Sequence, residues 1–69
     1  MTLSPERIGD RGQRYVVMAE GYPKKGENKI AYCTLEPVAW RCANATKRAP
    51  GCTKAWVLDR EEDRITHIA

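Results

Sequence analysis

The side chains best suited to chemistry in this sequence are three cysteines and one histidine. Cys33, Cys42, Cys52 and His67 could form a Cys₃His zinc site, or a cysteine–histidine pair for nucleophilic catalysis. Structural zinc sites usually present their ligands in close pairs, whereas gaps of eight and nine residues separate these cysteines. Nothing near His67 in the sequence would orient it as a base. We therefore expect no metal site, no cofactor and no catalytic residue, and keep a zinc-stabilised domain as an alternative.

The acidic run at 61–63 is a second candidate for acid–base or metal chemistry. Arg60 and Arg64 flank it, which is typical of a solvated turn that carries its own counter-ions. None of the glycines lies in a phosphate-binding loop between a strand and a helix. The sequence therefore predicts a protein that is not an enzyme.

Positive charge and an aromatic residue gather on one predicted helix. No acidic residue occurs between Glu36 and Asp59, and Trp40 lies roughly 160° from the centre of the apolar stripe at 100° per residue. A large aromatic on a solvent-directed face is typical of a binding anchor. A second cationic group lies beside Tyr22. The predicted partner-binding residues are Trp40, Arg41, Asn44, Lys47, Arg48, Tyr22, Lys24 and Lys25.

Trp40 also has a structural interpretation. Leu3 and Ile8, in a predicted flexible leader at 1–13, could fold back over the indole and bury it. Loss of the side chain would then lower the stability of the fold instead of weakening the binding of a partner.

Length and composition indicate one small domain at 14–69. The chain has 69 residues, of which 42% are hydrophobic, and a net charge of +3. The odd number of cysteines and the early charged residues after Met1 argue against a secreted disulfide domain. No apolar run approaches the roughly 18 residues of a membrane span. We therefore expect a cytoplasmic protein with free thiols.

Four segments have the composition of strands and one that of a helix. The strands are expected at 14–20, 29–34, 53–59 and 64–69, with Ile65 and His67 on one face of the last strand and Thr66 and Ile68 on the other. The sequence thus predicts an α+β fold, a small antiparallel β-sheet in the order β-β-α-β-β with one helix packed on one face.

The helix is expected at 34–49, with Thr34 as its N-cap and Pro37 in the first turn. Its apolar stripe includes Val38, Ala39, Cys42, Ala45, Thr46 and Ala49. We expect Val38→Asp to unfold the domain, because that stripe should face the sheet. The predicted core consists of Val17, Val38, Cys42, Val57 and Leu58, with Trp56 or Tyr32.

In length, element order and lack of catalytic motifs, the chain resembles the short accessory proteins of phages and other mobile elements, including anti-CRISPR proteins. This resemblance implies a protein that binds and blocks a host machine, and it implies no site residues. The first hypothesis is therefore a non-enzymatic protein-binding module, an inhibitor of a host nucleic-acid-handling complex, whose partner is an acidic or nucleic-acid-binding protein.

The alternative is a small DNA- or RNA-binding protein. Nine acidic residues dilute the twelve basic ones, which favours a protein partner over nucleic acid. A four-stranded sheet has two edges, and dimerisation through one of them is left open.

Overall fold

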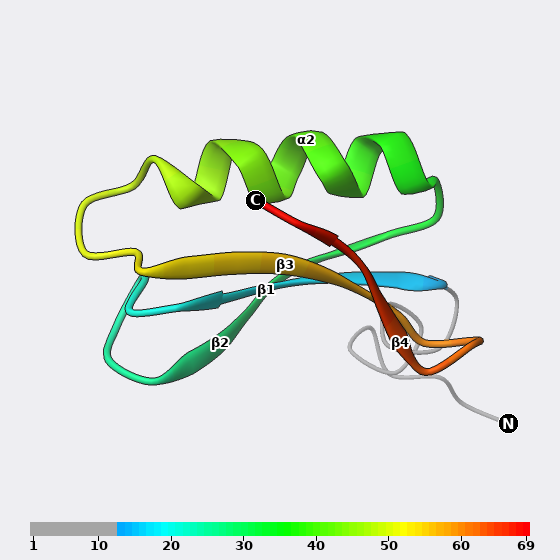
Figure 1. Ribbon diagram of the computed structural model, residues 1–69, viewed down its shortest axis with the longest axis horizontal. Coiled ribbons are helices and arrows are strands. Elements are labelled where there is room, and N and C mark those ends of the chain that lie inside the picture. Colours follow the sequence, from blue (N-terminus) through cyan, green and yellow to red (C-terminus); the bar gives the residue numbers. More distant parts are fainter. Residues whose placement is uncertain (1–12) are drawn as a thin grey trace, which may run out of the picture.

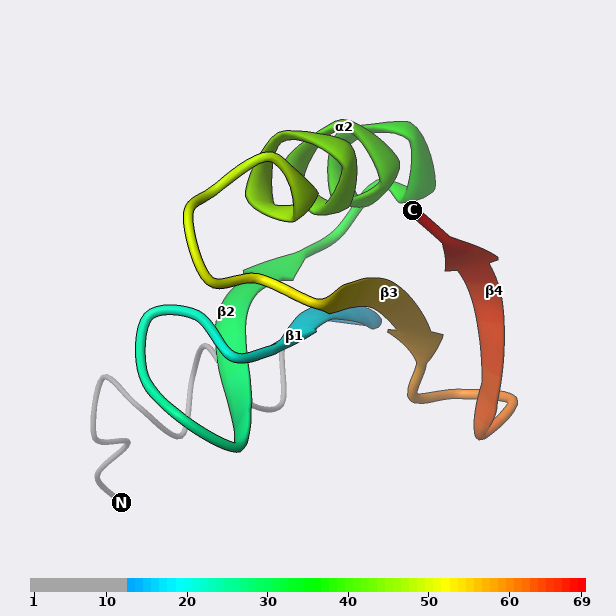
Figure 2. The same ribbon diagram turned by 60° about the vertical axis from the view of Figure 1, so that its left-hand side comes forward.

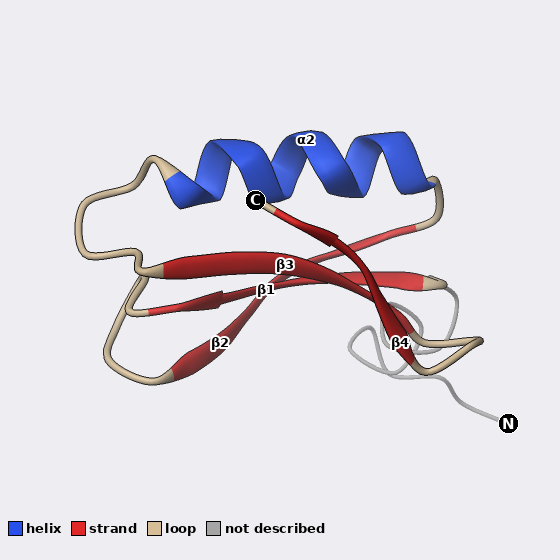
Figure 3. Cartoon of the chain, viewed as in Figure 1, coloured by secondary structure: helices blue, strands red, loops and turns tan. Residues whose placement is uncertain are grey.

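The computed structural model describes residues 13–69, so the predicted leader, with Leu3 and Ile8, lies outside the described residues except for Gln13. Five elements follow one another in the order β-β-α-β-β (Figure 3). They are β1 (Tyr15–Glu20), β2 (Glu27–Cys33), α2 (Glu36–Lys47), β3 (Lys54–Asp59) and β4 (Arg64–Ile68). The predicted α+β fold is confirmed.

The four strands form one antiparallel sheet in the order β2-β1-β3-β4. Because β2 and β3 are both antiparallel to β1, they run parallel to each other, and α2 is the crossover that joins them. The helix lies across one face of the sheet (Figure 1). We call the other face the open face, because no described element covers it.

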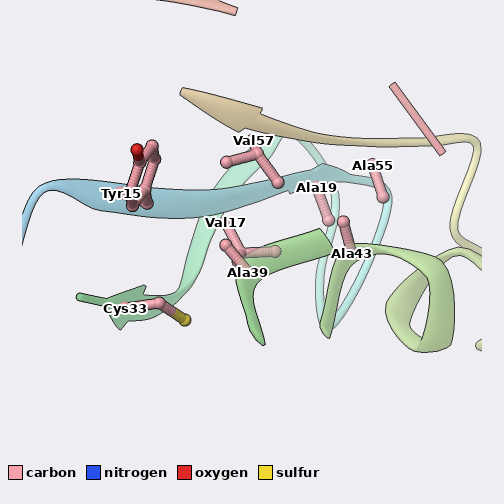
Figure 4. Packing of buried hydrophobic residues seen from close by; sticks show 8 residues of the cluster. All are labelled: Tyr15, Val17, Ala19, Cys33, Ala39, Ala43, Ala55 and Val57. Atoms are coloured by element: carbon pink, nitrogen blue, oxygen red, sulfur yellow. The ribbon is translucent and has the colours of Figure 1, made fainter. Parts of the chain in front are cut away.

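The core is small and consists mostly of alanine and valine. Val17 pairs with Val57 and Ala19 with Ala55, so these four side chains lie on the face under α2. They meet two alanines of the helix, and all six residues are fully buried (Figure 4). Short side chains on both sides let the helix lie close to the sheet. The predictions for Val17 and Val57 are confirmed; the two alanines are Ala39 and Ala43.

The predicted helix register is wrong. The buried residues of α2 are Ala39, Ala43 and Thr46, a face rotated by roughly 60° from the expected stripe at 100° per residue. Val38 is 45% exposed, so an aspartate there would remain in water and the expected unfolding by Val38→Asp does not follow. Cys42 is half-buried against the core. Leu58, Trp56 and Tyr32 lie on the open face and are also only half-buried, whereas Val16, which pairs with Leu58 and Tyr32 on that face, is buried.

The helix begins without the predicted cap. Leu35 occupies the N-cap position with no side-chain hydrogen bond, and the hydroxyl of Thr34 instead donates to the Oε1 of Gln13. Pro37 lies in the first turn, as expected. At the other end the N–H of Arg48 donates to the carbonyl of Ala45, so the helix ends earlier than the sequence predicts.

The predicted facing of the last strand is also wrong. A register shift between Val57 and Leu58 leaves one more residue in β4 than in β3. Leu58 is therefore opposite Ile65, while Trp56 is opposite Ile68. Both isoleucines lie on the open face, and His67, opposite Val57, lies on the helix side.

An ion pair closes the end of the sheet where β1 begins and β3 ends. The guanidinium of Arg14 donates to both carboxylate oxygens of Asp59, at 2.9 and 2.8 Å. Asp59 is buried and also accepts the N–H groups of Glu61 and Glu62, which shapes the β3–β4 turn. Hydrogen bonding from Arg14, supported by these N–H groups, lowers the pKa of Asp59 from 3.8 to about 2.

The first prediction is an acid-dependent loss of stability that depends on Asp59. Because its pKa is lower in the folded state, the ionised carboxylate stabilises the fold above about pH 4, and this stabilisation is lost as the pH falls from about 4 to about 2. We measure the free energy of unfolding by urea denaturation at several pH values. In this window it should depend less steeply on pH for Asp59→Asn than for the wild-type protein. The exposed Asp63 provides the control, Asp63→Asn, which should keep the wild-type slope. The same pH dependence for all three proteins would contradict the assignment of this loss of stability to Asp59.

The second prediction tests the observed helix register. Ala43→Leu places a large side chain where α2 meets the sheet and should destabilise the fold by about 1–3 kcal/mol. Ala45→Leu makes the same change at an exposed position and should shift stability by less than about 0.5 kcal/mol. The free energy of unfolding in urea measures both. A larger loss for Ala45→Leu would favour the register expected from the sequence.

Candidate partner-binding surface

Trp40 lies on the flank of α2 that faces β4. Its ring stacks on the imidazole of His67, with centroids 5.2 Å apart and an interplanar angle of 22°. The Nε2 of His67 donates to the Oδ1 of Asn44 at 3.0 Å. In Figure 2, β4 rises out of the plane of the other strands toward α2, which is how His67 comes within reach of the helix. Trp40 therefore links α2 to the edge strand, while 39% of it remains exposed.

The other predicted helix residues divide between two faces. At 100° per residue, Lys47 lies on the same flank as Trp40 and Asn44, whereas Arg41 and Arg48 point away from the sheet. All three cations are exposed. The structure thus brings Trp40, Asn44 and Lys47 together and separates them from the two arginines.

The predicted residues Tyr22, Lys24 and Lys25 lie in the β1–β2 loop, at the end of the molecule where α2 ends (Figure 1). The side-chain amide of Asn28 donates to three carbonyls of this loop. Gly21 has a φ of +86°, and a Cβ there would lie 2.3 Å from the carbonyl oxygen of Gly51. This close approach holds the start of the β1–β2 loop against the loop that follows α2.

A hollow of about 430 Å³ is lined by residues from the end of β1, the start of β2, the last turn of α2, β3 and β4. Its large apolar side chains are Trp56 from β3 and Ile65 and Ile68 from β4. The two isoleucines are 50% and 73% exposed. Charged and small residues complete the lining: Glu20, Glu27, Lys47, Thr53, Lys54 and Ala69.

The hollow and the Trp40 flank meet at Lys47, which lies in the last turn of α2 and lines the hollow. Lys54 forms an ion pair with Glu20 across the open face, with 3.9 Å between Nζ and Oε1. We refer to the hollow and its charged lining as the candidate surface. It offers an apolar floor and both signs of charge.

Sequence reasoning missed the apolar part of this surface. The sequence predicts Trp56 as a core residue, as an alternative to Tyr32, and predicts the two isoleucines on opposite faces of the last strand. The sequence of β3 does contain a signal for this surface. Ala55 and Val57 on one face alternate with Trp56 and Leu58 on the other, so both faces of the strand are apolar. A strand with two apolar faces next to a single helix implies that one face is left for another contact.

The thiols do not gather into a site. Cys33, Cys42 and Cys52 are all free, and burial raises the pKa of the Cys33 thiol. Residues 13–69 contain no group of three or more His, Cys, Asp or Glu side chains placed to hold a metal ion. Across this same range, no helix is both long and apolar enough to cross a bilayer.

Comparison with protein-family models, curated proteins and solved structures found no match to this chain.

The third prediction concerns the contact between Trp40 and His67. Trp40→Ala should destabilise the fold by about 1–2 kcal/mol, and a double-mutant cycle with His67→Ala should give a coupling of about 0.5–1.5 kcal/mol, as measured for aromatic pairs. Urea denaturation supplies the four free energies of unfolding. In the control cycle, Trp40→Ala is combined with Ile65→Ala, on the other face of β4, and the effects should be additive. Zero coupling with His67→Ala would show that the stacking does not stabilise the fold.

Proposed function

We propose that this chain is a non-enzymatic protein-binding module and that its partner occupies the candidate surface. The observation that carries the proposal is the exposure of Ile65 and Ile68 beside Trp56 at one hollow. Scattered apolar residues on a protein surface need no explanation, but neighbouring apolar residues around a concavity with a charged rim are typical of interaction sites.

The energetics of folding support the same proposal. A side chain that is largely exposed gains only part of the roughly 1.5–3 kcal/mol that full burial would contribute. Ile68 is 73% exposed on an edge strand, where apolar side chains favour unwanted association. A partner that covers this isoleucine would gain the free energy of burial that folding leaves unused. Binding would then explain an apolar residue at this position, which the stability of the fold does not explain.

We further propose that binding blocks the partner, as in the phage and mobile-element proteins that the chain resembles in size and layout. A module without catalytic groups can inhibit by occupying a surface that its target needs. The free thiols suit a reducing cytoplasm, where such a target would be found.

A nucleic-acid-binding role is the second candidate. The exposed cations at the end of α2 and in the β1–β2 loop could contact phosphates. The hollow favours protein, because aliphatic side chains make up most of its apolar floor and bases stack on aromatic platforms.

The fourth prediction tests the proposed function by comparing three immobilised proteins in a host-cell lysate. Wild-type and Leu35→Asp should capture the same protein, and Ile68→Asp should capture at least about tenfold less, as measured by quantitative mass spectrometry. Leu35 is a matched control, because it is 63% exposed and lies at the start of α2, away from the hollow.

Both aspartates replace exposed residues and should change the free energy of unfolding by less than about 0.5 kcal/mol, which thermal denaturation can check. If wild-type and Ile68→Asp capture identical sets of proteins, the hollow is not the binding surface.

A further inference from the structure

We infer that a second copy of this chain pairs with the outer edge of β4, so that antiparallel β4 strands join the sheets of two copies into one continuous sheet. The inference does not rest on the proposed function. It comes from three features of β4: the outward backbone groups of the strand, its exposed isoleucines and the symmetry of their positions.

The backbone of β4 turns polar groups to the outer edge at Ile65 and Ile68. The N–H of Ala69 donates to the carbonyl of Ala55 at 2.9 Å. Bonded and non-bonded positions alternate along an antiparallel ladder, so every second residue of β3 from Ala55 bonds to β4 and the residues between them do not. Those residues between pair with Ile65 and Ile68. The N–H and C=O groups of both isoleucines therefore point outward, where no strand within residues 13–69 pairs with them.

Of the two edges of the sheet, β4 is the less protected against pairing. After Arg64 it holds no acidic residue, lysine or proline, whereas β2 presents the exposed Glu27 and Lys29. Charged side chains and prolines are common protection for an edge strand. Each edge has a register shift, so bulges do not distinguish the two. The exposed side chains of β4 are instead Ile65 and Ile68, at 50% and 73%.

The spacing of these isoleucines makes the edge self-complementary. A two-fold axis that places Ile65 opposite Ile68 of the second copy also places Ile68 opposite Ile65. Both pairs then use outward N–H and C=O groups, and all four isoleucines lie on the open face. Thr66 and His67 separate the pairs on both strands alike, so the irregularity of β4 does not break this register. A slip of one residue in either direction separates both pairs.

The same axis brings unlike charges of α2 together. His67 contacts Trp40 and Asn44, near the middle of the twelve-residue helix, so an axis beside His67 passes near that middle. The helix of the second copy then runs in the opposite direction, with its Glu36 end toward the Lys47 end of the first. Both residues lie on the flank of Trp40, at spacings of four and seven residues. A parallel arrangement would bring like charges together.

The dimer is compatible with a partner on the candidate surface. Pairing uses the backbone edge and the sides of the isoleucines, and leaves the open face of each copy uncovered. Trp56, Ile65 and Ile68 of the two copies would then form one larger apolar floor.

The fifth prediction is a concentration-dependent dimer of the purified protein, measured by sedimentation equilibrium. Ile65→Lys and Ile68→Glu should each raise the dissociation constant at least about tenfold, since each substitution enters the contact twice. Val38→Lys is the matched control and should change it less than about twofold, because Val38 is also β-branched, is 45% exposed and lies on the opposite flank of α2 from Trp40. A wild-type protein that stays monomeric up to about 1 mM would overturn the inference.

A mixing experiment identifies which residues face each other. Ile65→Lys mixed with Ile68→Glu should form a heterodimer, because the introduced charges lie opposite each other. Ile65→Lys mixed with Ile65→Glu carries the same charges at positions that are not opposite, and should associate at least about fivefold more weakly. Equal dissociation constants for the two mixtures would overturn the proposed pairing.

Backbone N-methylation of Ile68 separates this inference from the proposed function. A synthetic segment 52–69 that carries the methyl group can be ligated to residues 1–51 at the Gly51–Cys52 bond, with the unmodified ligated protein as control. The methyl group removes the outward donor and keeps the isoleucine side chain, so the dimer should be lost while the thermal stability is unchanged.

Persistence of the dimer after N-methylation of Ile68 would overturn the inference. A loss of thermal stability would overturn it as well, since it would show that this N–H bonds to β3. A monomeric wild-type protein whose capture of a lysate protein is lost on N-methylation would assign the edge to a strand of that protein. Capture that depends on the Ile68 side chain and survives N-methylation would support the proposed function, whatever the state of the dimer.

Discussion

The close contact of α2 with β1 and β3 is the constraint on which the other features depend. Ala39 and Ala43 meet alanines and valines of the central strands, so little volume separates the layers. A helix held this close brings its flank near the edge strand, and Trp40 can reach His67. The same helix covers only one face of the sheet, because it is the single described helix. Within residues 13–69, the open face has no second layer of helix over it.

The irregular pairing of β3 with β4 determines what that open face displays. With regular alternation, Ile65 and Ile68 would lie on opposite sides of the sheet. The register shift places both on the open face, and His67 on the side of the helix. One extra residue thus produces two features at once: a polar and aromatic contact that holds the edge strand to α2, and an aliphatic floor beside Trp56.

The element order and the small core of valines could be predicted from the sequence, since composition and turn residues mark each strand and the helix. The helix register could not, because Val38 and Leu35 are more hydrophobic than Ala43, yet only the alanine fits against the sheet. The face of the sheet on which Ile68 lies could not be predicted either. A register shift is decided by pairing between strands, and the sequence of one strand does not reveal it. The candidate surface could not be predicted because the helix register and the register shift between β3 and β4 both depend on tertiary contacts.

The separation of charge follows from topology. The sequence carries no acidic residue from 37 to 58, a stretch that spans most of α2 and the start of β3. Because α2 ends near the point where β3 begins, Lys47, Arg48 and Lys54 come together at one end of the molecule (Figure 1). Cations at a helix C-terminus also oppose its partial negative charge, so this placement is favourable for folding. A cluster that folding already favours lies next to an apolar hollow that folding does not explain.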